Sequence, residues 1–274
     1  MRYNELGNTG IKVSHISLGG ASFSNFYGSF DEEKGVQLIR QALECGINYV
    51  ETGPWYGEGT SERTFGKVHD CTFAPDMSIV FKETLPALER AVRDGKARYI
   101  GLADYDIDLM KEVIEESDAK ISSLLSYAKS TLCDNRLQNY TSYFKSKGVG
   151  VINAAATGMG LLSNHGPQPW HPASDDIKAI CKKASDYCKE QNVELARLAT
   201  WFTLNQPGID TNICGFYNVE QLRDSVHVLD NGLTEHEQQV LRDIQLRFFE
   251  NVELHWDNVE LPAYQAKLAE IQGK

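Results

Sequence analysis

The stretch that decides the fold is INYVETGPWYGEGTSERTFGKVHDCTFAP, residues 47–75. Its first part, residues 47–53, is an apolar run rich in Ile, Val and Tyr, which predicts a buried strand. A Gly-rich loop holding Tyr56 follows, and His69 lies in a short Val-His-Asp segment only thirteen residues later. Strand and helix patterns alternate over longer units elsewhere in the chain, so the short interval between Tyr56 and His69 departs from that pattern.

Other runs share this near-continuous apolar character, and amphipathic stretches with helical periodicity separate them. Such runs indicate parallel strands covered on both faces, and repeated strand–helix units imply right-handed crossovers. The further predicted strands are residues 12–21, 97–104, 121–128, 148–156 and 209–217. Six units without a Gly-x-Gly-x-x-Gly motif after the first strand favour a (β/α) barrel over a doubly wound nucleotide-binding fold.

Two helices have ends that can be located in the sequence. Asp31 is placed to cap a helix over residues 32–44. A second helical pattern covers residues 75–96, and the internal Pro86 is expected to kink it.

Local patterns near the two ends of the chain are also specific. Thr234 and Glu237 form a capping-box pattern ahead of a late helix. Residues 2–6 and 11–14 flank a Gly-Asn-Thr-Gly turn, which predicts an N-terminal hairpin.

In a barrel of parallel strands, function lies at the carboxyl ends of the strands. Several predicted ends carry unusual residues, namely residues 19–22, Glu51 with Tyr56, Asp104, residues 126–127 and residues 215–217. The last of these runs into a helix whose amino-terminal amides can hold a phosphate.

The composition is that of a globular protein and excludes several classes of function. The 274 residues can bury a full core, and we expect one domain over residues 1–274. A formal net charge of −11 argues against a nucleic-acid partner, because phosphate binding requires a basic surface. The chain has no apolar run long enough for a membrane and no leader-like start, so the sequence predicts a cytoplasmic protein.

Neither the cysteines nor the histidines form a ligand pattern. The six cysteines lack Cys-x-x-Cys spacing, and Cys181 and Cys188 share one helix face, so buried free thiols are predicted. The seven histidines have no acidic or thiol partner at ligand spacing, and no metal site is predicted.

The motifs occur in a specific order that covers nearly the whole chain. They are YNELGNTGIKVS, SLGGASF, INYVETGPWYGEGTSERTFGK, GKARYIGLADY, LLSYAKSTLCDN, GVGVINAAATGMGLL and NVELARLATWFTLNQPGIDTNICGFYNVEQLRDSV. In this order they resemble the aldo-keto reductase family, most closely its L-galactose dehydrogenase-like and aldose dehydrogenase-like branch. The resemblance implies an eight-stranded barrel, a nicotinamide cofactor, NADP(H) or NAD(H), bound without a Rossmann fold, and hydride transfer to or from a carbonyl carbon.

The resemblance also implies a catalytic set of Asp, Tyr, Lys and His, in which the Tyr donates a proton to the carbonyl oxygen. Tyr56 matches the Tyr, Glu51 takes the Asp position five residues earlier, and His69 matches the His. Two alternatives remain open at this point: Tyr56 as an aromatic residue packing on the rim, and His69 as a surface histidine at the junction.

No residue matches the catalytic lysine, which in the family ends the third strand. Between Lys67 and Val68 the chain lacks that strand, its helix and most of the fourth strand. The three steps from Gly66 to His69 span at most ~10 Å, whereas a strand that reaches the rim spans ~17 Å. The predicted fold is therefore α/β, a TIM (β/α)8-type barrel without these elements. Lys67 and Lys82 are predicted to be solvent-exposed.

A shortened barrel has three possible outcomes. It closes with fewer strands, it stays open, or it pairs with a second chain at the unpaired edge. We expect self-association through that strand edge.

The resemblance implies cofactor contacts at Gly20, Ala21, Ser22, Ser126, Gly215, Phe216, Tyr217, Gln221, Asp224 and Ser225. Gln221 stands where members that prefer NADPH commonly have an Arg, and Asp224 adds negative charge beside it. Ala103 and Asp104 replace a common Ser-Asn pair that holds the nicotinamide amide. Weakened cofactor binding without clear NADP selectivity is expected.

Two interpretations of function follow. The first is an NAD(P)H-dependent oxidoreductase acting on an aldose, aldehyde or ketone, with Tyr56 as proton donor and activity impaired by the missing lysine. The alternative is a non-catalytic truncated isoform or pseudoenzyme that binds cofactor or a protein partner.

Overall fold

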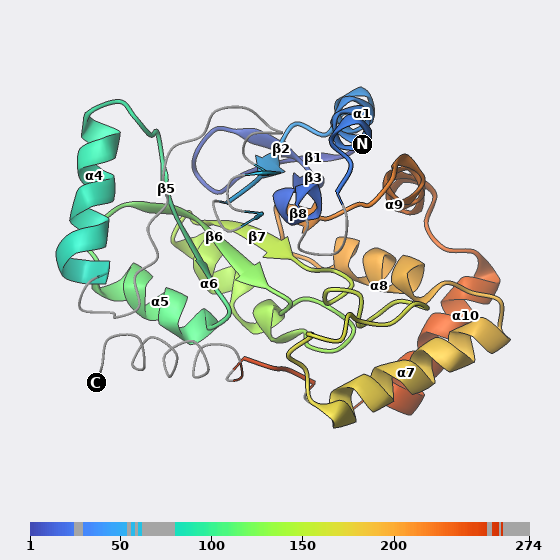
Figure 1. The fold of residues 1–274 in the computed structure, drawn as a ribbon. Helices are drawn as coiled ribbons and strands as arrows, with labels where there is room; N and C mark the ends of the chain where they lie inside the picture. Colours follow the sequence, from blue (N-terminus) through green and yellow to red (C-terminus); the bar gives the residue numbers. More distant parts are fainter. Residues whose placement is uncertain are drawn as a thin grey trace, which may run out of the picture.

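A computed structural model describes residues 1–24, 30–53, 56–57, 60–61, 80–250, 254–257 and 259. Strands and helices alternate along the chain as the sequence predicts (Figure 1). The strands are β1 Tyr3–Glu5, β2 Lys12–Ser14, β3 Ile16–Gly19, β4 Val50–Glu51, β5 Ile100–Asp104, β6 Ile121–Tyr127, β7 Gly150–Ala154 and β8 Thr211–Cys214. The helices are α1 Glu32–Glu44, α4 Leu85–Arg93, α5 Ile107–Glu116, α6 Thr141–Ser146, α7 Asp175–Glu190, α8 Leu195–Leu204, α9 Val219–Asn231 and α10 Glu235–Ile244.

Six strands form one curved parallel sheet in the order β4-β3-β8-β7-β6-β5. Each lies within one of the predicted apolar runs. Among the described strands β4 and β5 are consecutive in sequence, yet they lie at opposite edges of the sheet. In a closed (β/α)8 barrel, strands that are consecutive in sequence are also neighbours in the sheet. The two strands that would complete an eight-stranded barrel therefore belong between β4 and β5. The barrel-type α/β fold is therefore confirmed, as an open six-stranded sheet within the described residues.

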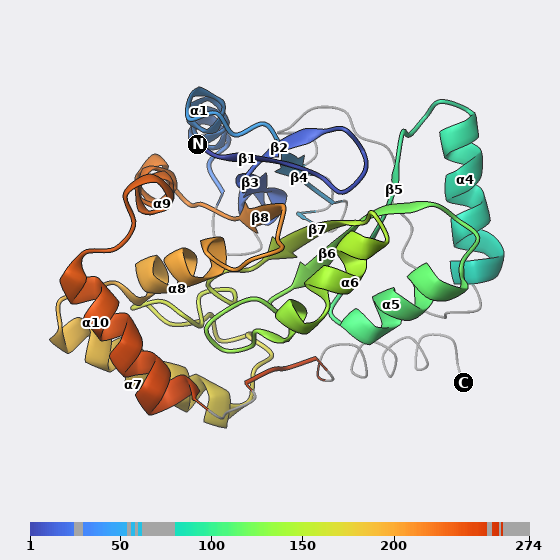
Figure 2. The same cartoon turned by 180° about the vertical axis from the view of Figure 1, so that it is seen from behind.

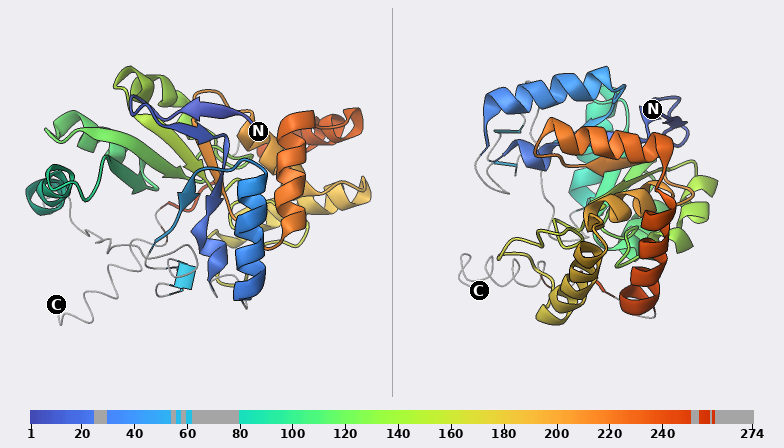
Figure 3. Two further views of the ribbon diagram at one scale, coloured as in Figure 1. Left: turned by 90° about the horizontal axis from the view of Figure 1, so that it is seen from above. Right: turned by 90° about the vertical axis from the view of Figure 1, so that its right-hand side faces the viewer.

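Helices cover the outer face of the sheet in two groups. α1 and α9 lie side by side (Figure 3), and together with α7, α8 and α10 they enclose a core that includes Leu18, Leu38 and Leu222. α4, α5 and α6 cover β5, β6 and β7 (Figure 2), with Leu124 and Phe144 fully buried between them. These are the apolar stripes that the helical periodicity predicts.

The hairpin of β1 and β2 closes the amino-terminal end of the sheet. The Asn8 amide donates to the Gly148 carbonyl at 2.9 Å, just ahead of β7. Leu6 is buried among inward-facing side chains of β7 and β8. Gly7 has a φ of +51°, and a Cβ there would lie 2.3 Å from the Gly150 nitrogen. The hairpin therefore leaves the carboxyl ends of the strands as the open end, where the site was predicted.

The predicted helix ends are confirmed where the structure describes them. Asp31 caps α1 by accepting from the Lys34 amide at 3.2 Å. Thr234 and Glu237 form the predicted capping box at the start of α10.

The predicted helix over residues 75–96 is described from Val80 onward. A π-helical turn, Val80–Thr84, precedes α4, and Pro86 lies in the first turn of α4. The winding therefore changes from π-helical to α-helical just before Pro86. Pro86 itself lies in the first turn of α4, where a missing backbone N–H is best tolerated. Lys82 is exposed, as predicted.

The described cysteines are free, as predicted. Cys133, Cys181, Cys188 and Cys214 are buried, and Cys45 is half-buried. The Sγ atoms of Cys133 and Cys181 lie 3.6 Å apart.

Candidate functional site

Glu51 and Tyr56 meet at the carboxyl end of β4. Glu51 is the last residue of that strand, and a turn in which the Tyr56 amide donates to the Gly53 carbonyl at 3.0 Å follows it. The Tyr56 hydroxyl donates to Glu51 Oε1 at 2.9 Å, and the Gly20 amide donates to Glu51 Oε2 at 3.4 Å. The two residues that the sequence separates by five positions are thus in direct contact.

The electrostatics of this pair depend on burial. Burial raises the pKa of the Glu51 carboxyl, while the hydrogen bonds from Tyr56 and Gly20 act in the opposite direction. Tyr49 lies two residues earlier, just before β4, and burial and the Glu51 charge raise its pKa. A carboxyl that holds its proton more strongly than usual, bonded to a phenol, is an arrangement suited to proton transfer.

Gly20 fits the corner between β3 and β4 because it has no side chain. A Cβ at Gly20 would lie 2.6 Å from both the Glu51 carbonyl oxygen and Ser61 Oγ. Ser61 Oγ is also hydrogen-bonded to Thr52 Oγ1 at 2.8 Å. The close approach of these segments fixes the strand end that carries the carboxylate.

The ends of β3 and β8 come together beside this corner. Ala21 and Ser22 lie in a 3-10 turn, Gly20–Phe23, that directly follows β3. A Cβ at Gly215, one residue after β8, would meet Ser22 Cβ and Oγ at 3.8 Å. Phe216 is buried, whereas Tyr217 is 56% exposed.

The start of α9 holds three further predicted cofactor positions. Gln221 Oε1 accepts from the Tyr217 amide at 2.9 Å. Asp224 forms an ion pair with Arg197 of α8, which also pairs with Glu237. One cation thus serves two carboxylates, so the expectation that Asp224 adds negative charge near Gln221 stays a prediction. Ser225 is half-buried on the same helix.

Ser126 lies on the other face of the sheet. Leu125 and Tyr127 of β6 pack with the inward-facing residues, whereas Leu124 packs under α5 and α6. Side chains alternate along a strand, so the fully buried Ser126 shares the helix-facing side with Leu124. Asp104, paired with Ser126 in the register, has a pKa raised by burial.

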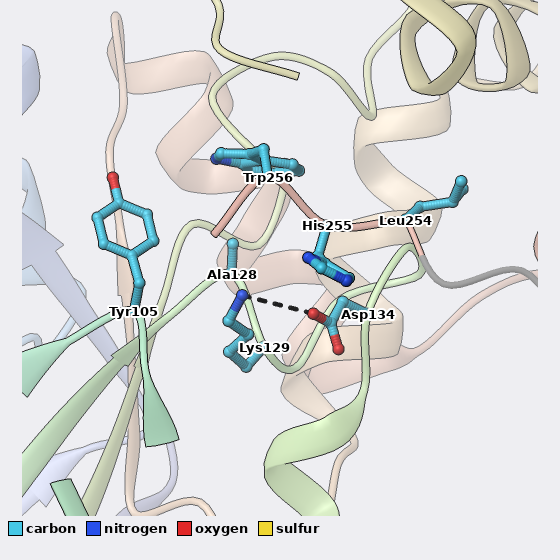
Figure 4. A pocket seen from close by; sticks show the side chains of 7 residues that line it. All are labelled: Tyr105, Ala128, Lys129, Asp134, Leu254, His255 and Trp256. Carbon is cyan, nitrogen blue, oxygen red and sulfur yellow. Dashed lines mark ion pairs between the residues drawn. The ribbon is translucent and has the colours of Figure 1, made fainter. Parts of the chain in front are cut away.

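Sequence reasoning missed a small pocket at the carboxyl end of β6 (Figure 4). Lys129, two residues beyond β6, is only 3% exposed, and burial lowers its pKa to about 8 while Asp134 acts in the opposite direction. The available signal was a lysine directly after an apolar strand, followed by an Asp and an Arg. The pocket is lined by Tyr105, Ala128, Lys129, Asp134, Leu254, His255 and Trp256.

The remaining predictions concern His69 and Lys67, metal ligands and membrane-spanning segments. His69 and Lys67 lie outside the described residues. Among the residues that the structure places, no group of three or more His, Cys, Asp or Glu is arranged to hold a metal ion. The same part of the chain has no helix that is both long and apolar enough for a membrane span.

The chain belongs to the Aldo/keto reductase family, whose sequence profile matches residues 15–70 and 69–246. It is 29% identical to L-galactose dehydrogenase of Arabidopsis thaliana, over 81% of this chain and 86% of that protein. It is 26% identical to D-arabinose 1-dehydrogenase of Saccharomyces cerevisiae, over 86% and 91%. The resemblance seen in the sequence is thereby confirmed.

Solved structures show the same fold. The glycerol dehydrogenase AKR11B4 from Gluconobacter oxydans matches with a TM-score of 0.66 at 17% identity, over 91% of this chain and 96% of that one. The aldo-keto reductase AKR11C1 from Bacillus halodurans, in its holo form, matches with a TM-score of 0.60 at 19% identity, over 92% and 99%. The chain belongs to this family and is similar to two sugar dehydrogenases, and both findings support an oxidoreductase.

Proposed function

We propose that this protein is an NAD(P)H-dependent oxidoreductase that transfers a hydride between the nicotinamide cofactor and an aldose, aldehyde or ketone. Tyr56 is the proposed proton donor. The observation that carries the proposal is the 2.9 Å hydrogen bond from the Tyr56 hydroxyl to the half-buried Glu51 at the carboxyl end of β4. A phenol at this end of a barrel-type sheet lies where family members perform their chemistry. The names of the two curated relatives favour an aldose as the substrate class.

The residues around the corner fit a nicotinamide nucleotide. Gly20, Ala21, Ser22 and Gly215 bring two strand ends together without bulky side chains, and the partly exposed Tyr217 follows Gly215 by two residues. Gln221 brings hydrogen-bonding capacity but no positive charge, so NAD(H) and NADP(H) are both compatible. When bound, the nicotinamide supplies or accepts the hydride.

The proton steps involve this chain's own residues. Tyr56 Oη would give its proton to a carbonyl oxygen, or take one from an alcohol in the reverse direction. Glu51 Oε1 accepts the hydrogen bond that orients the phenol. Burial raises the pKa of Glu51, so this carboxyl holds a proton more strongly than an exposed one, while the hydrogen bond from Tyr56 acts in the opposite direction. His69 remains the proposed residue that orients the carbonyl.

We infer that the activity is impaired, because about one and a half strand–helix units are absent at Lys67–Val68. Three observations support this inference. The two matches to the family profile meet at residues 69–70. The alignment to the Arabidopsis protein spans 274 positions but only 81% of this chain of 274 residues, so about a fifth of its positions have no residue here. The strands on either side, β4 and β5, form the two edges of the described sheet.

The decisive experiment separates cofactor binding from turnover. Titration of the protein with NADPH and NADH, followed by Tyr and Trp fluorescence, is expected to show saturable quenching. Turnover with a panel of aldoses and simple aldehydes is expected to be slow. Replacing Tyr56 with Phe is expected to lower kcat/KM by a further ~10²-fold or more while leaving the quenching unchanged.

A matched control removes a phenol–carboxylate bond elsewhere. The Tyr140 hydroxyl donates to Asp108 Oδ1 at 2.7 Å on the surface, so Tyr140→Phe is expected to keep the parental kcat/KM. If Tyr56→Phe turns over as fast as the parent, the proposed role of Tyr56 is wrong.

The alternative function is a non-catalytic protein that binds cofactor or a partner. It is favoured by the missing segment, because the catalytic lysine of the family ends the strand that is absent. Saturable quenching without turnover of any carbonyl substrate would establish this alternative. We also propose that residues 1–274 form a single domain. The protein is further proposed to self-associate through an unpaired strand edge.

A further inference from the structure

Two buried thiols from distant parts of the sequence lie against each other. Cys133 belongs to the loop between β6 and α6, and Cys181 lies in α7. Their Sγ atoms are 3.6 Å apart, although 48 positions separate the two residues in the sequence. A disulfide bond is about 2.0 Å long, so the two sulfur atoms need to approach each other by only about 1.5 Å to form one.

The backbone that carries Cys133 is held by hydrogen bonds of its own loop and of α8. The Cys133 amide donates to Thr131 Oγ1 at 3.2 Å, and the Thr131 amide donates to the Asp134 carbonyl at 2.9 Å. Thr203 of α8 donates through its hydroxyl to the Ser130 carbonyl at 3.0 Å. Because the loop is fixed in this way, each thiol meets the other at a high effective concentration.

The pairing distinguishes these two thiols from the other buried cysteines. Cys188 lies on the same buried face of α7, two turns beyond Cys181. In the part of the chain that the structure describes, the bond between Cys133 and Cys181 is the one that joins two thiols. Burial alone therefore does not bring two sulfur atoms together here, and the contact is specific to this pair.

We propose that Cys133 and Cys181 form a reversible disulfide when the protein meets a peroxide, and that this bond locks the loop after β6 to α7. The proposal does not rest on the proposed enzymatic function. Cys133 is 6% exposed and Cys181 is 1% exposed, so the peroxide reaches Cys133 first.

The reaction balances with one hydrogen peroxide for each disulfide. The Cys133 sulfur attacks the peroxide, the O–O bond breaks, and a sulfenic acid and one water form. The Cys181 sulfur then attacks the sulfenic sulfur, so the S–S bond forms, the S–O bond breaks and a second water leaves. The two thiols lose two protons and two electrons in total, and a dithiol reverses the reaction by thiol–disulfide exchange.

The surroundings make this device slow to close and stable once closed. The hydrogen bond with Cys181 and burial both raise the pKa of the Cys133 thiol. The thiolate is the reactive form, so we expect Cys133 to be oxidised more slowly than an exposed cysteine. The disulfide joins positions far apart in sequence, which restricts the unfolded chain and stabilises the folded protein.

The test maps the bond directly in the full-length protein. The protein is treated with excess hydrogen peroxide, its remaining thiols are alkylated, and it is digested without reduction for mass spectrometry. We expect a linked pair of peptides that contain Cys133 and Cys181 and that separate on treatment with dithiothreitol. The melting temperature of the oxidised protein is expected to be higher than that of the reduced protein by roughly 5 °C or more.

Cys188→Ser is the matched control, because it removes a buried thiol from the same face of α7. This variant is expected to keep both the linked peptides and the rise in melting temperature. Cys181→Ser and Cys133→Ser are each expected to lose both, with folding of the reduced proteins checked by circular dichroism.

Three results would overturn the proposal. The first is the absence of linked Cys133 and Cys181 peptides under conditions that oxidise the half-buried Cys45. The second is a rise in melting temperature that persists in Cys181→Ser and Cys133→Ser. The third is a linked pair without any rise in melting temperature, because the bond would then form in opened molecules and would not lock the folded one.

Discussion

At the scale of single residues, Glu51 is the most informative departure from the family pattern. Its side chain is one methylene longer than that of an Asp, and it contacts the Tyr56 hydroxyl directly. The Gly20 amide holds the other carboxylate oxygen at 3.4 Å. The sequence predicted that both residues lie at the same strand end and the loop that follows it, but it did not predict their hydrogen bond.

Glu51→Gln tests the raised pKa of this carboxyl through the stability of the protein. The folded protein binds the Glu51 proton more strongly than the unfolded chain does, because burial raises the pKa. The stability from this proton is complete below the ordinary glutamic acid pKa and is lost as the pH rises through the raised value. We therefore expect the free energy of unfolding of the parent to fall with pH across this window relative to Glu51→Gln.

The measurement is urea unfolding of both proteins at several pH values between pH 4 and pH 8, a range chosen to start near the ordinary glutamic acid pKa of about 4.3. Glu112→Gln, at an exposed position of α5, should run parallel to the parent. Parallel curves for Glu51→Gln and the parent would contradict the raised pKa.

At the scale of elements, local sequence rules predicted the capped helices and the six parallel strands. The caps at Asp31 and Thr234 bond to backbone amides only three residues away. Such local patterns can be recognised in the sequence without knowledge of the tertiary structure. The pocket at Lys129 could not be predicted in the same way. Asp257 lies 128 residues away from Lys129, and no local pattern encodes a contact over that distance.

Thr234→Ala tests the capping box of α10. Thr234 Oγ1 accepts from the Glu237 amide at 3.2 Å, and Glu237 Oε2 accepts from the Thr234 amide at 2.7 Å. Losing the hydroxyl is expected to lower the free energy of unfolding by about 1 kcal/mol, measured by urea denaturation. Thr234→Ser keeps the hydroxyl and should stay close to the parent. Equal losses in both variants would show that the methyl group matters instead of the cap.

At the scale of the whole molecule, the main feature is that the sheet formed by the described residues has two unpaired edges, β4 and β5. β4 has a neighbour on one side only within the described residues, and Val50 on that strand is 39% exposed. The sequence predicted which strands would flank the gap, because the junction at Lys67 and Val68 lies between them. It left three outcomes open for the gap, since local patterns do not determine whether a sheet closes.

Unpaired strand edges tend to pair with another chain, so we expect concentration-dependent dimers or larger species in light scattering after size-exclusion chromatography. Val50→Lys places a charge on the edge strand and is expected to shift the distribution toward monomer. A monodisperse parent protein over the full concentration range would contradict this expectation.

The hairpin at the amino-terminal end has a consequence for ligand access. It covers that end of the described sheet, so a nicotinamide and a carbonyl compound bound by the proposed enzyme would both approach Glu51 and Tyr56 from the carboxyl ends of the strands. When two ligands share one entrance, the one lying deeper cannot depart before the one that covers it.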